Sequence, residues 1–332
     1  MTTKKYNWAI LGPGKIAHTF VNDLKLLPNA NLYAVGSRNI DRARDFSKQY
    51  NFQKAYGSYE ELAADPDIDI IYIASPHINH YKSTLLCLNH GKAVLCEKPV
   101  AINSRQFKVM IETAKKNNVF FMEALWTQFI PSFQKCKQLI EEGAIGEIKL
   151  LVADFCFKAH YDLEGRIFNP NLGGGSLLDI GIYPVFIALS LLGLPKTIKA
   201  MASFANTGVD SGCSMLFQHN DNAISVLFSS VETDGRNEAL IHGSEGSIKI
   251  KSRWHMPSTL DILKRGADTE HFSFFEPGNG YQYEAAEVMK CLDEKRVEST
   301  VFSWQDSQNL ISTLDAVRSE AGIKYPDEIE KL

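Results

Sequence analysis

Residues Tyr6–Leu11 (YNWAIL) followed by Gly12–Ala17 (GPGKIA) form the stretch that decides the fold of this chain. The first six residues are mostly apolar and end at a glycine, which is typical of a buried strand. The next six match the pattern G-x-G-x-x-A and open a predicted helix over Lys15–Leu26. In such a turn the first glycine allows a tight bend, the second lets the backbone approach a pyrophosphate, and the alanine lets helix and strand pack closely.

This turn predicts a phosphate site at the start of a helix, where backbone amides and the helix dipole favour negative charge. The candidate cofactor-binding residues in it are Gly12, Gly14, Lys15 and Ile16. The alternative is a glycine turn without a ligand, but the strand before it and the helix after it favour dinucleotide binding.

Further strands follow at regular intervals in the first third of the chain. Apolar runs predict them at Asn31–Ser37, Ile68–Ala74, Ala93–Cys96 and Val119–Glu123. Helical patterns lie between these runs, and strands that alternate with helices indicate a doubly wound parallel sheet. We therefore predict an α/β fold that begins with a dinucleotide-binding Rossmann domain over residues 1–124.

The pattern changes in residues 125–332. A helix is predicted from Ser176 to Leu192, directly after three glycines, and a succession of strands runs from Thr197 to Phe275. One of these strand pairs, Ala239–Lys251, reads as a hairpin with a tight turn. These features predict a second, α+β domain with a large, mostly antiparallel sheet.

The composition excludes several other classes of protein. The chain has 332 residues and a formal net charge of −4, which gives no support for a nucleic-acid surface. Its six cysteines are scattered without a C-x-x-C pair, so we expect reduced, buried thiols, a cytoplasmic location and no metal site. The N-terminus shows no signal sequence, and the apolar stretch Pro184–Leu194 is shorter than the roughly 20 residues that cross a bilayer.

The end of the second predicted strand indicates which dinucleotide binds. NAD enzymes usually place a carboxylate there, hydrogen-bonded to the ribose 2′-hydroxyl. This chain has Gly36-Ser37-Arg38-Asn39 instead. Ser37 can donate to a 2′-phosphate and Arg38 can clamp it, so we predict NADP, with NAD left open.

Other cofactor candidates follow the later strands, because ligands of a doubly wound sheet bind beyond the carboxyl ends of its strands. They are Ser75, Pro76, His77 and His80 after one strand, and Glu97 and Lys98 after the next. Glu97 is expected to hold the Lys98 ammonium, and Pro99 to fix the chain beyond it.

Lys98, Asp179 and Tyr183 are the candidate catalytic residues. Asp179 and Tyr183 are four apart on a predicted helix and therefore project from one face. A tyrosine is a weak base with an ordinary pKa near 10, but a neighbouring cation such as Lys98 favours the phenolate. Four further residues are candidates for the substrate site, although most aromatic residues at such spacing are core: Trp126, Phe155, Arg166 and Trp254.

The glycine turn, Glu97-Lys98-Pro99 and the Asp179/Tyr183 pair together resemble the glucose-fructose oxidoreductase/inositol dehydrogenase (Gfo/Idh/MocA) family over nearly the whole chain. Glu123–Phe129 and Gly173–Tyr183 are most similar to its dimeric dihydrodiol dehydrogenase and NADP-dependent D-xylose dehydrogenase branches.

The resemblance implies an NAD(P)-dependent dehydrogenase that acts on a CH–OH group of a sugar or vicinal diol, with Tyr183 as general acid/base. It also implies a cis Lys98–Pro99 peptide bond, and a second domain that binds substrate and forms a homodimer or higher homo-oligomer through its sheet. Two other functions stay open on the same fold: a non-catalytic NAD(P)-binding sensor or transcriptional co-regulator, and a reductase of imines or biliverdin-like ligands. Retention of all three catalytic candidates favours the dehydrogenase.

Overall fold

The computed structural model describes residues 4–331, which form two compact units. The first unit contains the chain up to Ala101, Arg105–Trp126 and Pro277–Ser307, and the second contains Ile102–Ser104, Thr127–Glu276 and the chain from Gln308. The predicted division at residue 124 had assigned everything after it to one domain. Residues 277–307 instead group with the first unit.

The first unit is built on a six-stranded sheet in which every neighbouring pair is parallel. Its strands are β1 (Tyr6–Leu11), β2 (Ala30–Gly36), β3 (Lys54–Tyr56), β4 (Ile70–Ile73), β5 (Ala93–Glu97) and β6 (Phe121–Ala124). Their order, β3-β2-β1-β4-β5-β6, is that of the doubly wound dinucleotide-binding fold and confirms the predicted class. The short, half-buried strand β3 was not predicted, because it carries no apolar run.

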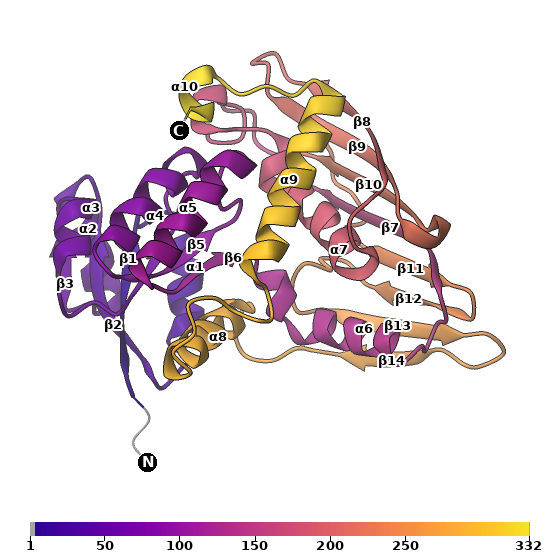
Figure 1. The fold of residues 1–332 in the computed structure, drawn as a ribbon, viewed down its shortest axis with the longest axis horizontal. Helices are drawn as coiled ribbons and strands as arrows, with labels where there is room; N and C mark the ends of the chain where they lie inside the picture. The colour runs from indigo at the N-terminus through magenta and orange to yellow at the C-terminus, as the bar shows by residue number, and fades with distance from the viewer. Residues whose placement is uncertain (1–3, 332) are drawn as a thin grey trace. The chain divides into compact units, whose positions relative to one another are not determined.

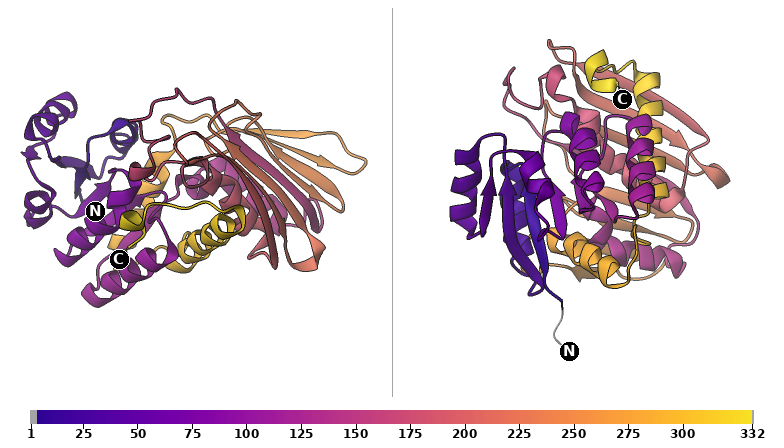
Figure 2. Two further views of the ribbon diagram at one scale, coloured as in Figure 1. Left: turned by 90° about the horizontal axis from the view of Figure 1, so that it is seen from above. Right: turned by 60° about the vertical axis from the view of Figure 1, so that its left-hand side comes forward.

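Helices flank both faces of this sheet (Figures 1 and 2). They are α1 (Lys15–Leu24), α2 (Ile40–Tyr50), α3 (Tyr59–Ala64), α4 (His80–Asn89) and α5 (Ser104–Asn117), with a short 3₁₀ turn, η1 (His77–Asn79). The late helix α8 (Tyr281–Asp293) belongs to the same unit. Its start is held by the buried carboxylate of Asp23 on α1, which accepts hydrogen bonds from the backbone N–H groups of Asn279 and Tyr281 at 2.8 and 2.9 Å. An acidic side chain thus satisfies amides at a helix N-terminus from outside the helix.

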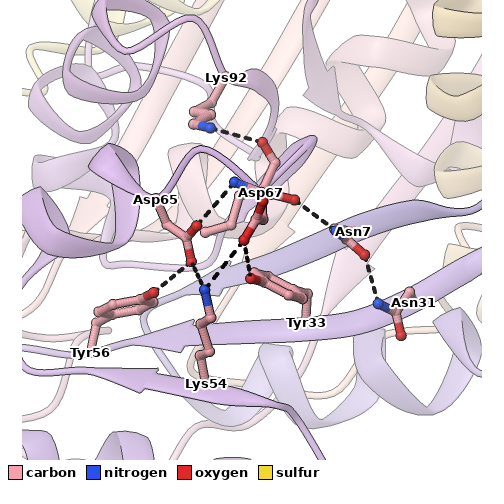
Figure 3. Close-up of polar contacts among 9 residues, drawn as sticks. Asn7, Asn31, Tyr33, Lys54, Tyr56, Asp65, Asp67 and Lys92 are labelled. Atoms are coloured by element: carbon pink, nitrogen blue, oxygen red, sulfur yellow. Dashed lines mark hydrogen bonds and ion pairs between the residues drawn. The ribbon is translucent and has the colours of Figure 1, made fainter.

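A network of polar side chains fastens β2 and β3 to the loop that follows α3 (Figure 3). Asp65 is its centre: the carboxylate accepts hydrogen bonds from the Tyr56 hydroxyl and, at 3.0 Å, from the Lys54 ammonium. Asp67 accepts from the Tyr33 hydroxyl at 2.9 Å. Burial opposes ionisation of Asp65, but these partners outweigh it and hold its pKa below the ordinary value. The network therefore fixes the otherwise weak strand β3.

The second unit contains an eight-stranded sheet that is antiparallel at every neighbouring pair except one. Its strands are β7 (Ile148–Cys156), β8 (Thr197–Phe204), β9 (Asp210–Gln218), β10 (Ile224–Ser230), β11 (Ala239–Gly243), β12 (Gly246–Ile250), β13 (Thr259–Lys264) and β14 (Glu270–Ser273). The order is β14-β13-β12-β11-β7-β10-β9-β8, and the parallel pair is β7 with β10. The predicted mostly antiparallel sheet is confirmed.

The helices of this unit gather on one face of the sheet (Figures 1 and 2). They are α6 (Pro131–Glu141), α7 (Ile182–Leu192), α9 (Trp304–Ala321), which begins in the first unit, and the short α10 (Asp327–Glu330). Within residues 4–331 no helix lies on the other face, where exposed and buried residues alternate along β9 and β10. The exposed positions of the three strands β8 to β10 include large apolar side chains: Met201, Leu216, Ile224, Val226 and Phe228.

The predicted helix from Ser176 to Leu192 is not a single α-helix. Leu177–Gly181 forms a π-helical turn and the α-helix α7 follows it. Pro184 explains the widening, because proline lacks an N–H and its ring would clash with the carbonyl four residues earlier. The segment Pro170–Leu192 has 23 residues, and its most apolar 18-residue window has a mean hydropathy of 1.8, so by length and composition it could cross a membrane. The apolar segment is therefore longer than the predicted stretch Pro184–Leu194, but 78% of that window is buried inside the protein, as in a core helix.

Candidate functional site

The glycine turn after β1 forms a cradle against the loop that follows β4. Gly12 has φ +93°, and a Cβ on it would lie 3.2 Å from the backbone nitrogen of Ser75. Gly14 is the N-cap of α1, and neither a side-chain cap nor an acidic residue occupies that helix start. The backbone amides at this helix N-terminus therefore face no competing carboxylate, as an anion site requires.

Ser75 adds a polar group to this cradle. Its hydroxyl oxygen is buried, and among the described residues it has no hydrogen-bond partner. A buried hydroxyl without a partner costs stability unless a ligand or water satisfies it. The glycine turn, the uncapped helix start and this hydroxyl together fit a bound dinucleotide at the predicted place.

The end of β2 is free of carboxylates, as predicted. Ser37 is buried and its Oγ accepts a hydrogen bond from the backbone N–H of Asn39 at 3.2 Å, which leaves the hydroxyl proton to donate elsewhere. Arg38 is exposed and lies near Tyr59 on α3. Burial raises the pKa of Tyr59, and the charges of Arg38 and Arg42 oppose that rise. Tyr59 was not predicted, because α3 approaches β2 only in the folded sheet.

The backbone around Lys98 is held at three consecutive residues. The Lys98 N–H donates to Glu97 Oε2 at 3.2 Å, the Pro99 carbonyl oxygen lies 2.7 Å from Nδ1 of His80, and the Val100 N–H donates to Glu123 Oε1 at 3.0 Å. The Lys98–Pro99 peptide bond is cis, as the family resemblance implied. Three buried side chains thus fix the loop that carries the candidate catalytic lysine.

His80 is a bracing residue in this structure. Its side chain is fully buried, and its second ring nitrogen, Nε2, lies 2.7 Å from the carbonyl oxygen of Ser75. It was predicted to face the cofactor, but its two nitrogens instead connect the loops after β4 and β5. A neutral imidazole has one N–H, so both contacts are hydrogen bonds only when the ring carries two protons.

Glu97 and Glu123 surround Lys98 with acidic groups. Glu97 was predicted to hold the lysine ammonium, and the structure shows its carboxylate accepting from the Tyr72 hydroxyl and from the Lys98 backbone. Burial raises the pKa of Glu123 to about 7, while the positive charge of Lys98 is among the influences that lower it. Lys98 therefore lies close enough to Glu123 for their charges to interact.

In the second unit, Arg166 and Asp179 form a bidentate ion pair. Nη1 and Nη2 of Arg166 donate to the two carboxylate oxygens of Asp179 at 2.9 and 3.1 Å. Arg166 was predicted for the substrate site and Asp179 for the catalytic set, and their pairing was not predicted. Paired N–H···O bonds of this type are among the strongest in proteins and fix the direction of the carboxylate.

Tyr183 lies in a group of three aromatic rings. Its ring centroid is 5.4 Å from that of Phe155 on β7 and 5.3 Å from that of His255. Phe155 was predicted for the substrate site, and the structure brings it to Tyr183. His255 was not predicted, because a single histidine in a loop between strands carries no recognisable pattern.

Trp254, the predicted neighbour of substrate, is a core residue. Its side chain is fully buried, and the indole N–H donates to the backbone oxygen of Asp154 at 2.8 Å. The residue after it, His255, is the one whose ring stands beside Phe155 and Tyr183. Trp126 is also buried, stacked on Tyr281 in the first unit at a centroid distance of 4.2 Å.

The glycine run before the π-helical turn lets two segments approach closely. A Cβ on Gly174 would lie 2.7 Å or less from the backbone oxygens of Arg166 and Ile167, and a Cβ on Gly175 would lie 2.1 Å from Oδ1 of Asp210. The other oxygen of Asp210 accepts from the Leu177 N–H at 2.6 Å. Glycine is thus required both for the loop that carries Arg166 and for the buried acid that caps the turn bearing Asp179.

Among residues 4–331 no group of three or more histidine, cysteine or acidic side chains is arranged to hold a metal ion. The polar groups of the two units are those of proton handling: a lysine with nearby carboxylates in one, and a phenol beside an imidazole and an Arg–Asp pair in the other. The chemistry that such groups support is acid/base catalysis.

Comparison with known proteins gives two family matches. Residues 6–125 match the model of an oxidoreductase family with an NAD-binding Rossmann fold, and residues 133–249 match the GFO/IDH/MocA C-terminal domain. A trans-1,2-dihydrobenzene-1,2-diol dehydrogenase from Xenopus tropicalis is 38% identical over 98% of this chain and 100% of its own length. The human protein of the same name is 32% identical over 97% of this chain and 98% of its own.

Solved structures show the same fold at lower identity. An aldose-aldose oxidoreductase from Caulobacter crescentus, complexed with glycerol, has a TM-score of 0.88 at 23% identity. A 3-ketoreductase from Actinomadura kijaniata, complexed with NADP and TDP-benzene, has a TM-score of 0.87 at 24% identity. Each comparison covers 96% of this chain and 98% of the other.

Asp210 makes the stability of the protein depend on pH. Burial raises its pKa to about 7 from an ordinary 3.8, although backbone N–H groups oppose the rise. Between these values the folded chain binds a proton that the unfolded chain lacks, so this contribution to the free energy of unfolding is complete below pH 4 and is lost as the pH rises through 7. We expect Asp210→Asn, which cannot ionise, to gain about 2–3 kcal/mol relative to the wild type between pH 5 and pH 8, from roughly 1.4 kcal/mol per pH unit.

Urea unfolding of both proteins at the two pH values measures this difference. Asp268→Asn, at an exposed position, serves as the control and should follow the wild type. Parallel pH dependence in Asp210→Asn and the wild type would contradict the assignment.

Proposed function

Since the chain belongs to the GFO/IDH/MocA family of NAD(P)-dependent oxidoreductases, we propose that it transfers a hydride between NADP and a carbinol carbon of a sugar or vicinal diol. The names of its relatives support this substrate class: dihydrodiol dehydrogenases among the sequences and sugar oxidoreductases among the structures. The nicotinamide, when bound, supplies the hydride chemistry, and the protein has to orient it and move a proton.

The first unit is assigned the cofactor. Gly12, Gly14, Lys15 and Ile16 present the turn and the helix N-terminus to the pyrophosphate, and the hydroxyl of Ser75 supplies a further donor beside them. We assign to the same site Pro76 and His77, which follow β4, and Glu97 at the end of β5, while His80 braces the loops after these two strands. Lys98 is assigned to hydrogen-bond the reacting oxygen, where its positive charge stabilises an alkoxide.

We assign the proton transfer to the second unit. Tyr183 takes it from the substrate hydroxyl or returns it to the carbonyl, according to the direction of the reaction. Asp179, held by Arg166, places a fixed negative charge one helical turn before Tyr183. Phe155 and His255 give the phenol an enclosed, mostly aromatic surrounding.

The bidentate Arg166–Asp179 pair on the π-helical turn that leads to Tyr183 is the observation that best supports an enzyme. A sensor that only binds a dinucleotide has no need of a fixed carboxylate and a buried phenol in its other unit. π-Helical turns within α-helices are frequent at functional sites, because the wider turn redirects side chains.

Turnover by the purified protein tests this function. We expect reduction of NADP with at least one member of a panel of aldoses, inositols and trans-dihydrodiols. Tyr183→Phe and Lys98→Ala should each lower kcat by about 100-fold or more, since acid/base groups contribute 10² to 10⁴ in rate. NADP affinity, measured by calorimetry, should stay within about threefold for Tyr183→Phe.

Tyr161→Phe is the matched control, because Tyr161 is a half-exposed tyrosine of the same unit. It should retain full turnover. Tight NADP binding by the wild type without turnover of any compound would instead favour the sensor.

We further propose that NADP is preferred over NAD. Arg38, near the Tyr59 hydroxyl and the charge of Arg42, forms with Ser37 a cationic end to β2 without an acidic residue. A guanidinium binds a phosphate through short, charge-assisted hydrogen bonds. Loss of such bonds removes about 1.5–3 kcal/mol, so Arg38→Ala should weaken NADP binding by roughly 10- to 100-fold and leave NAD binding nearly unchanged.

Calorimetric titration with both cofactors checks this preference. Arg44→Ala, a loss of an exposed arginine on the neighbouring helix α2, is the control and should bind both as the wild type does. An equal loss of affinity for NAD and NADP in Arg38→Ala would rule out a role of Arg38 in binding the 2′-phosphate.

We propose a homodimer, or a higher homo-oligomer, in which the open face of the second sheet meets a second copy. Leu216 on β9 lies directly opposite Val226 on β10, and both side chains are about two-fifths or more exposed. A contiguous exposed apolar patch of this kind marks an interface more often than free surface. In a two-fold symmetric dimer the same patch of both copies forms the interface, so the patch would be buried against its own counterpart.

Analytical ultracentrifugation tests the assembly. Leu216→Lys should shift the protein from dimer towards monomer at micromolar concentration, because a charge would then face an apolar partner. Leu26→Lys, at an exposed leucine of the first unit, should not. A monomeric wild type would disprove the proposal.

The cysteines support a reducing, cytoplasmic location. All six are free and buried, and none is paired in a disulfide. Such thiols persist where the redox poise keeps them reduced. Fractionation of cells that express the chain at native level tests this location, and recovery in a secreted fraction would contradict it.

A further inference from the structure

We propose that His255 is a specificity-determining residue that selects a polyhydroxylated substrate, an aldose, over a flat diol with an apolar ring. The inference rests on the proposed function and deepens it by naming the substrate class. It follows from the position of the imidazole among the rings around Tyr183, from the way its loop is anchored, and from the chemistry that a histidine brings there.

The imidazole is packed against both neighbours of the phenol. It stacks on Phe155 with ring centroids 3.9 Å apart and planes 18° apart, and it lies 5.3 Å from the ring of Tyr183. Phe155 and Tyr183 are themselves 5.4 Å apart, so the three rings form a closed triangle. His255 and Tyr183 are both buried. The ring next to Tyr183, the candidate acid/base, is therefore one that can form hydrogen bonds.

The loop that carries His255 is fixed on both sides. The hydroxyl of Thr127 donates to the His255 backbone oxygen at 2.8 Å. The preceding indole, Trp254, donates to the backbone oxygen of Asp154, the residue before Phe155. These two hydrogen bonds align His255 with Phe155, and so the stacked geometry is a built feature of the unit.

An imidazole differs from an aromatic hydrocarbon in its ring edge, which carries a donor and an acceptor. Face-to-face stacking on Phe155 occupies the face of the ring, and the nitrogens lie in its edge. A sugar brings several hydroxyls into an enclosed site, and each loses its water unless the protein replaces the hydrogen bonds. An arene dihydrodiol brings two hydroxyls and an apolar ring, for which a phenylalanine would be the better neighbour.

The charged neighbours favour the same substrate. Arg166 and Asp179 place a polar group on the turn before Tyr183, and Arg166 is about one-third exposed. A site built to hydrogen-bond hydroxyl groups rejects analogues that lack them more strongly than an apolar site rejects an additional hydroxyl. The polar and aromatic groups of this unit together therefore fit a ring that is apolar on its faces and hydroxylated around its edge, as a pyranose is.

The test compares two substitutions at this position in the full-length protein with NADP. His255→Phe keeps the stacked ring and removes both nitrogens, and His255→Asn keeps a donor and an acceptor in a smaller side chain. We expect His255→Phe to lower kcat/KM for aldoses by about tenfold or more, mainly through KM, since a sugar hydroxyl in the enclosed site would lose its hydrogen-bond partner. Its kcat/KM for trans-dihydrodiols should stay within about threefold or rise, and His255→Asn should recover part of the aldose activity.

A binding measurement accompanies the kinetics. Calorimetric titration of the NADP complex with the aldose should show weaker binding in His255→Phe, with NADP affinity itself unchanged. His271→Phe, at an exposed histidine on β14, is the control and should match the wild type in every measurement.

The outcomes separate this inference from the function on which it rests. Equal losses for aldoses and diols in His255→Phe, or no loss for either, would overturn the role of His255 and leave the dehydrogenase intact. A wild type that turns over diols only, and binds no aldose, would do the same. A wild type without any turnover would refute the proposed function, and aldose binding that is equal in the wild type and His255→Phe would then also refute the selection of sugars.

Discussion

Buried carboxylates that accept backbone N–H groups from distant segments are the interaction on which both units depend. Asp23 holds the start of α8, Glu123 holds the loop after the cis proline, and Asp210 holds the π-helical turn. Asp154 does the same for the Asn237–Glu238 backbone, close to the loop that carries Trp254. In each case an acid accepts amides that would otherwise be buried without partners, which is costly. Two of these acids fix segments that carry candidate site residues: Glu123 holds the loop of Lys98, and Asp210 holds the turn of Asp179.

The same arrangement holds the irregular backbone on which the candidate catalytic groups stand or which directly precedes them. Lys98 lies in a loop whose three successive backbone groups are held by separate side chains. Tyr183 follows a turn with π-helical geometry that Asp210 caps. Irregular backbone leaves polar groups without ladder partners, and side chains have to replace them. The position of Lys98 therefore depends on these side chains, and that of Tyr183 on helix α7 together with the capped turn before it.

Local patterns in the sequence were sufficient for five of the six strands of the first sheet, the glycine turn and the mostly antiparallel character of the second sheet. They failed where a contact depends on how the chain folds back on itself. The Arg166–Asp179 pair, 13 residues apart, depends on a loop that closes over glycine, and α8 joins the first unit through Asp23, 256 residues before Asn279. Apolar periodicity states which side of an element is buried but not which element covers it. Trp254 shows the same limit. An aromatic residue is a reasonable candidate for the substrate site, but the indole N–H of Trp254 donates to the Asp154 backbone and holds the ring in the core. The next residue, His255, is the one that lies beside Tyr183.

The return of Pro277–Ser307 to the first unit has a consequence for how the protein is made. During synthesis the six strands of the first sheet emerge long before α8, and until α8 arrives Asp23 lacks the amides that it holds and Phe20 lacks the edge of Tyr281. The nucleotide-binding unit is then complete only when more than nine-tenths of the chain has left the ribosome. A fragment cut after Trp126 would be an unfinished unit with a buried acid exposed, so the boundary between the units is not a place at which the gene can be divided. The segment that completes the first unit is therefore synthesised after Thr127–Glu276, which is most of the second.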